Sequence, residues 1–462
     1  MATYLTRTQT TGDPKKWNVS VWIKRSDLTG DNSFSNIIAA PSGDQGVWIA
    51  SDGQLDIYGT GSVRLKPKRK LRDPSAWYHV VVSYDSTQST SSDRIKAYIN
   101  GSQLTDFDTN NYPSLNEDSL FNVSGTVLHV GRRASSAEHY YKGYMAEMIF
   151  TDGYNYAPST FGSTNANGVW VPNVTPSVTY GNNGFRLQFA NSGSSADANG
   201  FGADTSGNNN HLASNALGTT PSTDDTPQNN FAVINLLSQQ PSNPATLDEG
   251  GLKATNTSSA NTDNNQARIL GTMFPTTGKW YMEIKYVSGY SATDGSVMVG
   301  LMSSNAGRAT TYSYGFNKNN GNDSHTVGYG NNGKIWYNGS EQTTGLTTFT
   351  TGDILGMAMD LTNGKFFVSK NGTFFSNGTG TQDPANGTNP LYSSTNIQNP
   401  SDGMTPGIQL YSNPNGVAQF NYGNPTFTIA SGNADANGYG NFEYAVPSGF
   451  YALCTKNLAQ YG

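Results

Sequence analysis

The sequence contains a single cysteine among 462 residues, so it can form no disulfide within the chain and no cysteine-based zinc site. Charged residues make up only 13% of the chain, and the net charge is -6. This weak acidic balance gives no electrostatic reason to bind nucleic acid. No apolar run approaches the ~20 residues of a membrane span, and the first residues lack the apolar core of a signal peptide. We expect neither nucleic-acid binding, nor membrane insertion, nor signal-directed secretion.

Turn-forming residues dominate instead. The chain has 52 glycines and few strong helix formers, which favours strands joined by tight turns. Short alternating apolar runs at residues 17–25 and 77–85, and again at 278–289 and 352–375, are typical of half-buried strands. Asn-Gly pairs within 352–375 predict type I′ hairpin turns. The fold class predicted is all-β, with two antiparallel β-sandwiches in tandem.

Composition also places the boundaries of these parts. Residues 1–190 form the first predicted sandwich, and residues 191–230, rich in Gly, Asn and Ser, are interpreted as a linker. Residues 231–425 form the second sandwich. Residues 426–462 are expected to be a C-terminal extension that packs on the second sandwich or on a partner.

One internal repeat lies near the two boundaries. ADANGFG at residues 196–202 and ADANGYG at 434–440 differ only at the aromatic position. Because Asn-Gly and the glycines mainly set backbone conformation, we expect equivalent turns at both places. A ligand loop shared by both segments is the alternative.

Two stretches resemble known domain families. Residues 71–104 contain a Trp-x-His strand, a surface loop and a strand ending in Asn-Gly, and resemble a laminin-G-like, concanavalin A-type module. Together with their surroundings, over about residues 1–190, they look like the version found in tailed-bacteriophage virion proteins. GKWYMEIKY, MVGLM and GDILGMAMDLTNGKFFVSKNG resemble a SPRY domain, over about residues 231–425. Residues 446–458 are similar to a tail that follows such domains in phage proteins. The resemblance implies a concanavalin A-like jelly roll followed by a SPRY-like sandwich.

The same resemblance implies a structural protein of the virion surface. A tail or head fibre or appendage would bind host-surface glycans or receptors through its sandwich loops, with other virion proteins as partners. A homo-oligomer, for example a trimer, would bind by multivalency, so that weak sites suffice. The alternative is a purely structural decoration or appendage subunit that binds only other virion proteins.

We expect no enzyme. A glycosidase needs two nearby carboxyl groups, and Glu147 and Glu283 each lack a second acid at strand spacing. His79 lies in a strand pattern typical of a structural histidine, and Cys454 follows an apolar run that predicts burial. A glycan-degrading enzyme whose acids converge in space is the less favoured alternative.

No cofactor is expected either. Laminin-G-like modules often hold Ca²⁺ at a sandwich edge, and acids at Asp106, Asp108, Asp224 and Asp225 could supply oxygens. Solvated loop acids are the simpler interpretation, so no metal ligand is assigned.

A basic stretch interrupts this weakly charged sequence. Its candidates for electrostatic contact with an anionic host lipopolysaccharide or an acidic virion neighbour are Arg64, Lys66, Lys68, Arg69 and Lys70. The interpretation that we favour is a charged edge strand that prevents sheet-to-sheet aggregation.

Aromatic residues supply the candidate glycan contacts, because sugar C–H faces stack on aromatic rings. The candidates, all in the second sandwich, are Tyr312, Tyr314, Tyr329, Trp336 and Tyr337. Partial exposure is expected for them, and Trp336 and Tyr337 should point to opposite faces of their strand. Trp22, Trp77 and Trp280 lie in core-like patterns and are expected to be buried.

Overall fold

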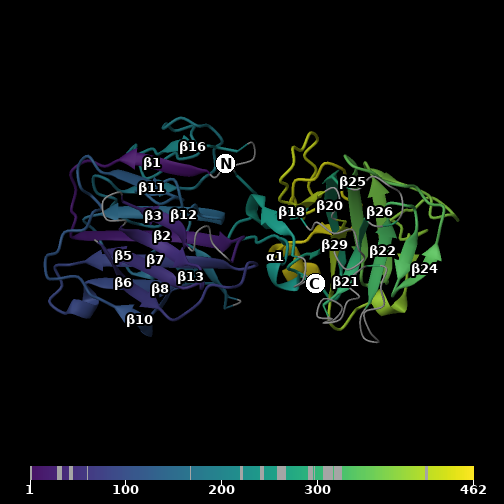
Figure 1. Cartoon of the computed structure of the whole chain (residues 1–462), viewed down its shortest axis with the longest axis horizontal. Helices are drawn as coiled ribbons and strands as arrows, with labels where there is room; N and C mark the ends of the chain where they lie inside the picture. The colour runs from purple at the N-terminus through teal and green to yellow at the C-terminus, as the bar shows by residue number, and fades with distance from the viewer. Residues whose placement is uncertain are drawn as a thin grey trace. The chain divides into compact units, whose positions relative to one another are not determined.

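The computed structural model describes residues 3–28, 34–40, 45–59, 61–166, 168–218, 222–239, 244–257, 267–289, 295, 297–304, 316, 325–411 and 415–462. The chain divides into two compact units, Met1–Ser222 and Thr223–Gly462, called here the first and second units (Figure 1). In the described part, strands dominate and the single α-helix is α1 (Thr455–Tyr461). The predicted all-β class is confirmed. No helix among the described residues is long and apolar enough to cross a membrane.

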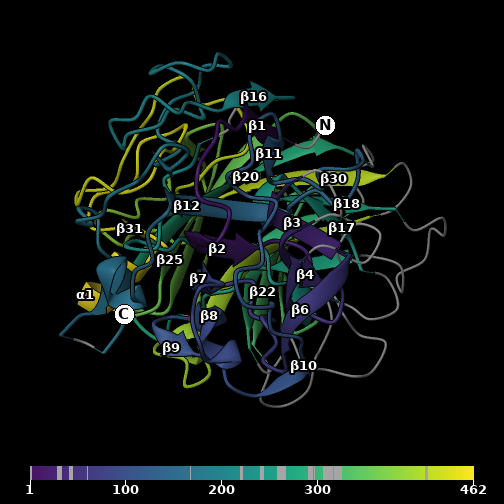
Figure 2. The ribbon, with the colours of Figure 1, turned by 90° about the vertical axis from the view of Figure 1, so that its left-hand side faces the viewer.

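The first unit is a sandwich of two antiparallel sheets. In spatial order the eight-stranded sheet contains β10 (Phe107–Asn110), β6 (Ser62–Pro67), β5 (Leu55–Gly59), β4 (Gly46–Ala50), β3 (Phe34–Ala39), β11 (Val127–Val130), β1 (Tyr4–Thr8) and β16 (Ala213–Asn215). The six-stranded sheet contains β15 (Phe185–Leu187), β12 (Gly143–Asp152), β2 (Lys16–Arg25), β7 (Trp77–Asp85), β8 (Ile95–Ile99) and β9 (Ser102–Gln103). Figure 2 shows the two layers of this unit.

Alternation along the strands fills the core of the first unit. Trp17, Val19, Val21 and Ile23 of β2 all point into the cluster between the sheets, as period-two side-chain placement requires. The opposite face of the six-stranded sheet is also covered. A segment containing η3 (Pro158–Thr160), β13 (Gly162–Thr164) and β14 (Trp170–Pro172) lies there, and its Phe161 packs with buried residues of that face.

The polar zone at 191–230 differs from the predicted linker. Its β16 pairs with β1 and extends the eight-stranded sheet, and the boundary between units falls at residue 222. Asp204 accepts backbone hydrogen bonds from Arg186 and Asn210, both at 2.8 Å. Asx side chains therefore satisfy the backbone where apolar packing is scarce. Up to residue 218, low hydrophobicity therefore marks a hydrogen-bonded part of the first unit.

The second unit is also a pair of sheets. One contains β17 (Thr246–Asp248), β18 (Lys253–Asn256), β30 (Gly416–Asn421), β20 (Lys279–Ser288), β25 (Ile354–Asp360), β26 (Lys365–Lys370) and β27 (Thr373–Phe374), with β28 (Tyr392–Ser393) on β26 and β31 (Tyr451–Ala452) on β20. The other contains β19 (Ala267–Leu270), β29 (Met404–Leu410), β21 (Met298–Ser303), β22 (Thr326–Gly330), β23 (Ile335–Tyr337) and β24 (Ser340–Thr343).

The predicted Asn-Gly turn chemistry is visible between β26 and β27. It is absent at the pair Asn363-Gly364, where Gly364 has a positive φ and Asn363 does not. Asn371 and Gly372 have φ angles of 49° and 79°, and positive φ at both central residues is what a type I′ turn requires. Asn can adopt this region more readily than other side chains, and glycine does so without strain.

The C-terminal extension is an integral part of the second unit. β31 pairs in parallel with β20, and Phe442 and Phe450 join the buried cluster around Tyr281. The fully buried Glu283 carboxylate accepts the backbone N–H groups of Glu443 at 2.9 Å and of Tyr444 at 2.8 Å. The extension was expected to pack on the second sandwich or on a partner, and the structure shows it packed on the second sandwich.

The internal repeat forms the same turn twice. Asp197 accepts the backbone N–H of Asn199 at 2.8 Å, and Asp435 accepts that of Asn437 at 2.9 Å. The backbone carbonyls of both aspartates also accept a bond from the glycine three residues on. The prediction of equivalent turns therefore holds for the four-residue turn. It does not hold for the glycines, because Gly438 and Gly440 have φ angles of 78° and 89° while Gly200 and Gly202 do not have positive φ. Asp435 is buried and has a further role, since its Oδ2 accepts the backbone N–H of Ala452 at 2.9 Å.

Candidate functional site

The predicted aromatic site is only partly accessible to a ligand. Tyr312 and Tyr314 lie outside the described residues. Tyr329, in β22 between β21 and β23, is fully buried, with its ring 5.6 Å from that of Phe349 and 5.3 Å from that of Phe375. The expectation that Tyr329 is partly exposed was therefore wrong, because an interior strand turns this ring into the core.

Trp336 and Tyr337 have different surroundings, as expected for neighbours on a strand. Trp336 packs against a buried cluster of Leu270, Met298, Met302 and Phe316. Tyr337 is half-buried and stacks on Tyr392 with 4.9 Å between ring centroids. Asn396 donates to the Tyr337 hydroxyl at 2.8 Å. Among the described candidates, Tyr337 is therefore partly exposed to solvent and has the side-chain amide of Asn396 beside its hydroxyl group. Trp22, Trp77 and Trp280 are buried, as predicted.

The basic stretch is largely neutralised within the chain. Three of its candidates form ion pairs, Arg64 with Glu117 at 2.6 Å, Lys66 with Asp56 at 3.5 Å and Lys68 with Asp106 at 2.8 Å. Arg69 and Lys70 are exposed. The favoured interpretation as an edge strand was wrong, because β6 lies between β5 and β10 and the edge position belongs to β10.

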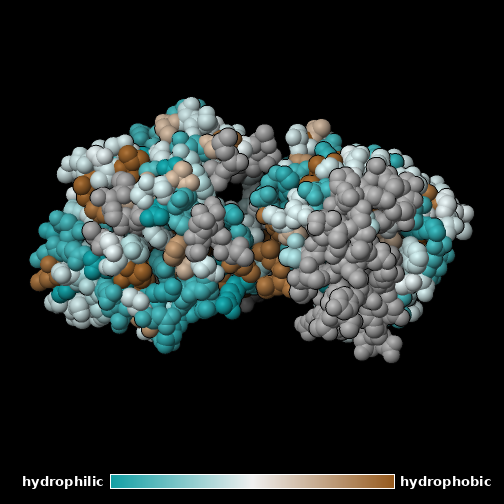
Figure 3. Space-filling model, in the orientation of Figure 1, coloured by the Kyte–Doolittle hydropathy of each residue, from teal (hydrophilic) through white to brown (hydrophobic). Residues whose placement is uncertain are grey.

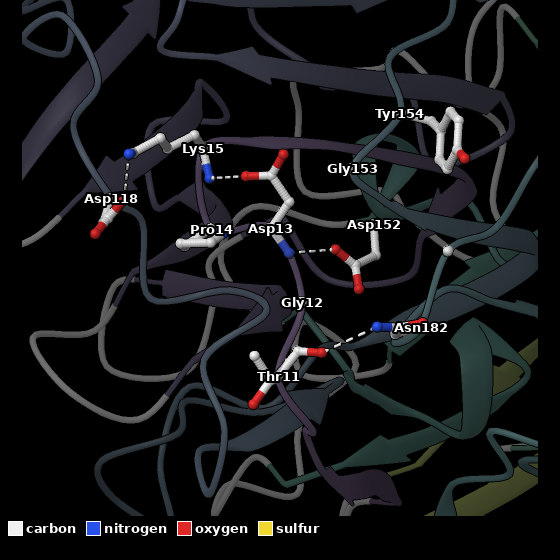
Figure 4. A pocket seen from close by; sticks show the side chains of 11 residues that line it. Thr11, Gly12, Asp13, Pro14, Lys15, Asp118, Asp152, Gly153, Tyr154 and Asn182 are labelled. Atoms are coloured by element: carbon white, nitrogen blue, oxygen red, sulfur yellow. Dashed lines mark hydrogen bonds and ion pairs between the residues drawn. The ribbon is translucent and has the colours of Figure 1, made fainter.

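A hollow of about 580 Å³ opens at the strand ends of the first unit (Figure 4). We call it the rim hollow, and its lining residues are Thr11, Gly12, Asp13, Pro14, Lys15, Asp118, Asp152, Gly153, Tyr154, Gly181 and Asn182. They come from the β1–β2 connection, the end of β12 and two further loops. The sequence did not predict this site because four segments that are distant in the chain form it. Each segment by itself has the sequence of an ordinary turn.

Asp152 holds the hollow together. Its buried carboxylate accepts the backbone N–H of Asp13 at 2.7 Å and that of Asn183 at 2.9 Å. Gly12 permits this arrangement, because a Cβ at this position would lie 2.1 Å from Asp152 Oδ2. Asp152 is thus a scaffold residue whose oxygens are already used by the loops.

Other polar groups are free to face solvent. Asp13 and Asp118 are exposed, and Lys15 Nζ lies 3.7 Å from Asp118 Oδ1. Tyr154 is 44% exposed and stacks on Tyr156 with 6.5 Å between ring centroids. Figure 4 shows the Tyr154 ring on one side of the hollow and Lys15 with Asp118 on the other. An apolar ring face opposite hydrogen-bonding groups can hold a small polar ligand that also has an apolar face.

The surface around the strands is otherwise polar. On the face in Figure 3, the described residues of the first unit are mostly hydrophilic, with small scattered apolar patches. Binding at this face would therefore depend on a few placed contacts.

His79 is held as a neutral structural side chain. It is fully buried, its Nδ1 accepts the Trp170 indole N–H at 3.0 Å, and its Nε2 lies 2.8 Å from Ser20 Oγ. An indole can only donate, so the neutral ring carries its proton on Nε2 and donates it to Ser20. His79 therefore cannot take a proton from Ser20. Burial lowers the pKa of His79 to about 3.

The remaining candidate reactive groups also have structural partners. Glu147 pairs with Arg186 at 2.6 Å, Glu283 binds backbone N–H groups as described above, and Cys454 is buried as predicted. No group of three His, Cys, Asp or Glu side chains within the described ranges is placed to hold a metal ion. Two acids considered for calcium bind protein groups instead: Asp106 pairs with Lys68, and Asp108 accepts a bond from Gln54 at 2.6 Å.

Comparisons with known proteins agree with this two-part architecture. Residues 2–154 match the concanavalin A-like lectin/glucanases superfamily, and residues 279–416 match the SPRY domain. No curated protein matches the chain.

Similar solved structures include the SPRY domain of human HERC1, at 16% identity over 42% of this chain and 99% of that chain, with a TM-score of 0.30. A SAP-like pentraxin from Limulus polyphemus is 15% identical over 32% of this chain and 69% of that one, with a TM-score of 0.24. A candidate carbohydrate-binding protein from Bacteroides ovatus is 15% identical over 47% of this chain and 56% of that chain, with a TM-score of 0.34. On the two family matches, the chain carries a concanavalin A-like module at its N-terminal side and a SPRY domain at its C-terminal side.

Proposed function

We propose that this protein is a non-enzymatic adhesin of a tailed-phage virion that binds host-surface glycans. The observation that carries the proposal is the rim hollow, where the exposed Tyr154 ring faces Lys15 and Asp118. Sugars present apolar C–H faces and hydroxyl groups that both donate and accept, so a ring beside a carboxylate and an ammonium group complements them. The lectin-containing family that matches residues 2–154 supports this ligand class.

The virion assignment rests on the resemblance of the N-terminal module and of the C-terminal segment to phage proteins. A shallow polar hollow implies weak binding by one copy. Several copies on one particle would raise the effective concentration of each further contact, so that the particle attaches firmly. Other virion proteins would then be the partners that display the chain, as a fibre, an appendage or a decoration.

Tyr154→Ala tests the site. Purified full-length chain is applied to an array of bacterial surface oligosaccharides, and the strongest binder is titrated. Loss of the ring should weaken binding about tenfold, the equivalent of about 1.4 kcal/mol. Leu115→Ala removes another exposed apolar side chain from the same unit, 54% exposed, and should leave binding unchanged.

A second assay addresses attachment itself. Soluble wild-type chain should slow adsorption of the phage that carries it, and Tyr154→Ala should compete less well. Wild-type chain that neither binds the array nor slows adsorption would refute the adhesin. New reducing ends after incubation with host polysaccharide would instead reveal a hydrolase.

A further inference from the structure

A row of polar side chains crosses the outer face of the eight-stranded sheet in the first unit. Asn36 lies directly opposite Trp48 on the neighbouring strand, and Trp48 lies opposite Asp56 on the next. Val47 and Ile57, which flank these positions, belong to the core between the sheets. Because successive side chains alternate, the three row residues share the face that points away from that core.

These side chains are buried, yet important polar atoms have no hydrogen bond. Asn36 is 0% exposed, and neither its Oδ1 nor its Nδ2 has a hydrogen-bond partner in the part of the chain that the structure describes. The same holds for Trp48 Nε1, in a side chain that is 5% exposed. Asp56 Oδ1 is paired with Lys66 Nζ at 3.5 Å but accepts no hydrogen bond among the described residues. Buried polar atoms are nearly always hydrogen-bonded, so the unpaired polar atoms of Asn36 and Trp48, on adjacent strands, need an explanation.

Aromatic rings flank the row. Trp48 stacks on Tyr58 with ring centroids 4.9 Å apart and planes within 4°. Phe34 contacts Trp48 edge-on at 5.4 Å. The row therefore combines an amide, an indole N–H and a carboxylate with apolar ring surface, which is the same chemistry as in the rim hollow, here on three neighbouring strands.

Residues 132–140, called here the cover, contact the Asn36 end of this face. The Asn36 backbone N–H donates to the His139 carbonyl at 3.0 Å, and the His139 ring meets Phe34 edge-on at 5.5 Å. The start of the cover is fixed by a bond from Gly131 N–H to the Ile37 carbonyl at 2.9 Å. His139 has a φ of +54°, a conformation that costs energy in a residue other than glycine. The cover is thus anchored at its base and strained where it contacts the row.

We propose that Asn36, Trp48 and Asp56 form a second saccharide-binding site, which opens when residues 132–140 move away from the sheet. The inference rests on the proposed function, because it assigns the same ligand class to a separate site. Hydroxyl groups can donate to Asp56 and Asn36 Oδ1 and accept from Asn36 Nδ2 and Trp48 Nε1. The row spans two inter-strand spacings, about 10 Å, which suits an oligosaccharide segment.

Other ligand classes fit the row less well. A peptide strand adds to a sheet through free backbone groups, and strands in the interior of a sheet offer none. An anion would find Lys66 already paired with Asp56 and with Asp52, each at 3.5 Å. Burial raises the pKa of Asp56 despite that lysine, so a neutral donor is a better match than a further charge.

The test uses Asn36→Leu and Trp48→Phe in the full-length chain. Leu has nearly the shape of Asn, so removing an unpaired amide should keep or raise the thermal midpoint while weakening binding of the strongest array oligosaccharide about tenfold. Trp48→Phe keeps an aromatic ring and removes the N–H, and should weaken binding several-fold. Asn110→Leu, at an exposed position of β10, is the matched control and should change neither property. Oligosaccharide should also change amide hydrogen exchange in residues 132–140.

The outcomes separate this inference from the proposed function. If wild-type chain binds but both row variants bind equally well, and exchange changes only around residues 11–15 and 152–154, the second site is refuted and the rim hollow stands. A lower thermal midpoint for Asn36→Leu with unchanged binding would mean that the amide has a structural partner such as an internal water, and would also refute the site. Failure of the wild-type chain to bind any oligosaccharide refutes the proposed function and this inference together.

Discussion

Acidification should destabilise the first unit through one side chain, His79. This residue is fully buried, and its Nδ1 is occupied by the indole N–H of Trp170. Protonation would place the Nδ1–H group against the indole N–H. The charged ring would also be buried away from water, and burial lowers the pKa of His79 from 6.5 to about 3. The unfolded chain has no such restraint and takes up the proton near the ordinary pKa.

The sign and size of the effect follow from this difference. Between pH 6.5 and pH 3 the unfolded state binds one proton more than the folded state, so stability falls as the pH falls. Each pH unit in this window is worth about 1.4 kcal/mol, and from pH 7 to pH 5 the His79 contribution is about 2 kcal/mol. His129 acts in the same direction, because burial also lowers its pKa. A variant comparison is therefore needed to isolate His79.

The assay is urea unfolding at pH 7 and pH 5, followed by tryptophan fluorescence. Five of the seven tryptophans lie in the first unit, so the signal reports mainly on it. The loss of stability should be about 2 kcal/mol smaller in His79→Gln than in wild type. Equal losses in the two proteins would refute the reasoning. An NMR titration of the wild-type ring gives an independent check, since His79 should remain neutral at pH 5.

Two further predictions concern the second unit. Glu283→Ala leaves the backbone N–H groups of Glu443 and Tyr444 without an acceptor. At about 1–3 kcal/mol for each unsatisfied donor, the change should cost about 2–6 kcal/mol and lower the calorimetric midpoint of this unit by about 10 °C. Glu341→Ala, which breaks only a surface ion pair with Lys334, should cost under about 1 kcal/mol, and equal costs for the two variants would contradict the assignment. A chain lacking residues 426–462 should lose the cooperative transition of the second unit, because that segment supplies part of its core; an unchanged transition would show that the extension is dispensable.

The strand pattern was predictable because its cause is local. Residues 77–85 were expected to form a strand and β7 covers the same residues, since a run of Val and aromatic side chains favours extended backbone. The structure buries this strand on both of its faces. The type I′ turn at Asn371 and Gly372 was predictable for the same reason. A type I′ turn requires positive φ at two adjacent residues, and Asn followed by Gly is the pair of residue types that adopts it most readily.

What failed depended on contacts between distant segments. We interpreted the polar zone after residue 190 as a linker because its hydropathy is low. Hydropathy does not show that side chains such as Asp204 accept hydrogen bonds from backbone N–H groups. We predicted that Tyr329 would be partly exposed because the sequence does not show which strands lie in the interior of a sheet. The rim hollow joins four segments, and no window of the sequence contains more than one of them. The virion role remains a prediction from resemblance.

The central claim is that an exposed ring beside hydrogen-bonding groups at the rim hollow binds glycan. The most direct measurement is a titration of purified full-length chain with host-surface polysaccharide, comparing wild type with Tyr154→Ala. The account predicts saturable binding by wild type and about tenfold weaker binding by the variant. Equal binding by the two proteins, or no binding by wild type, would contradict it.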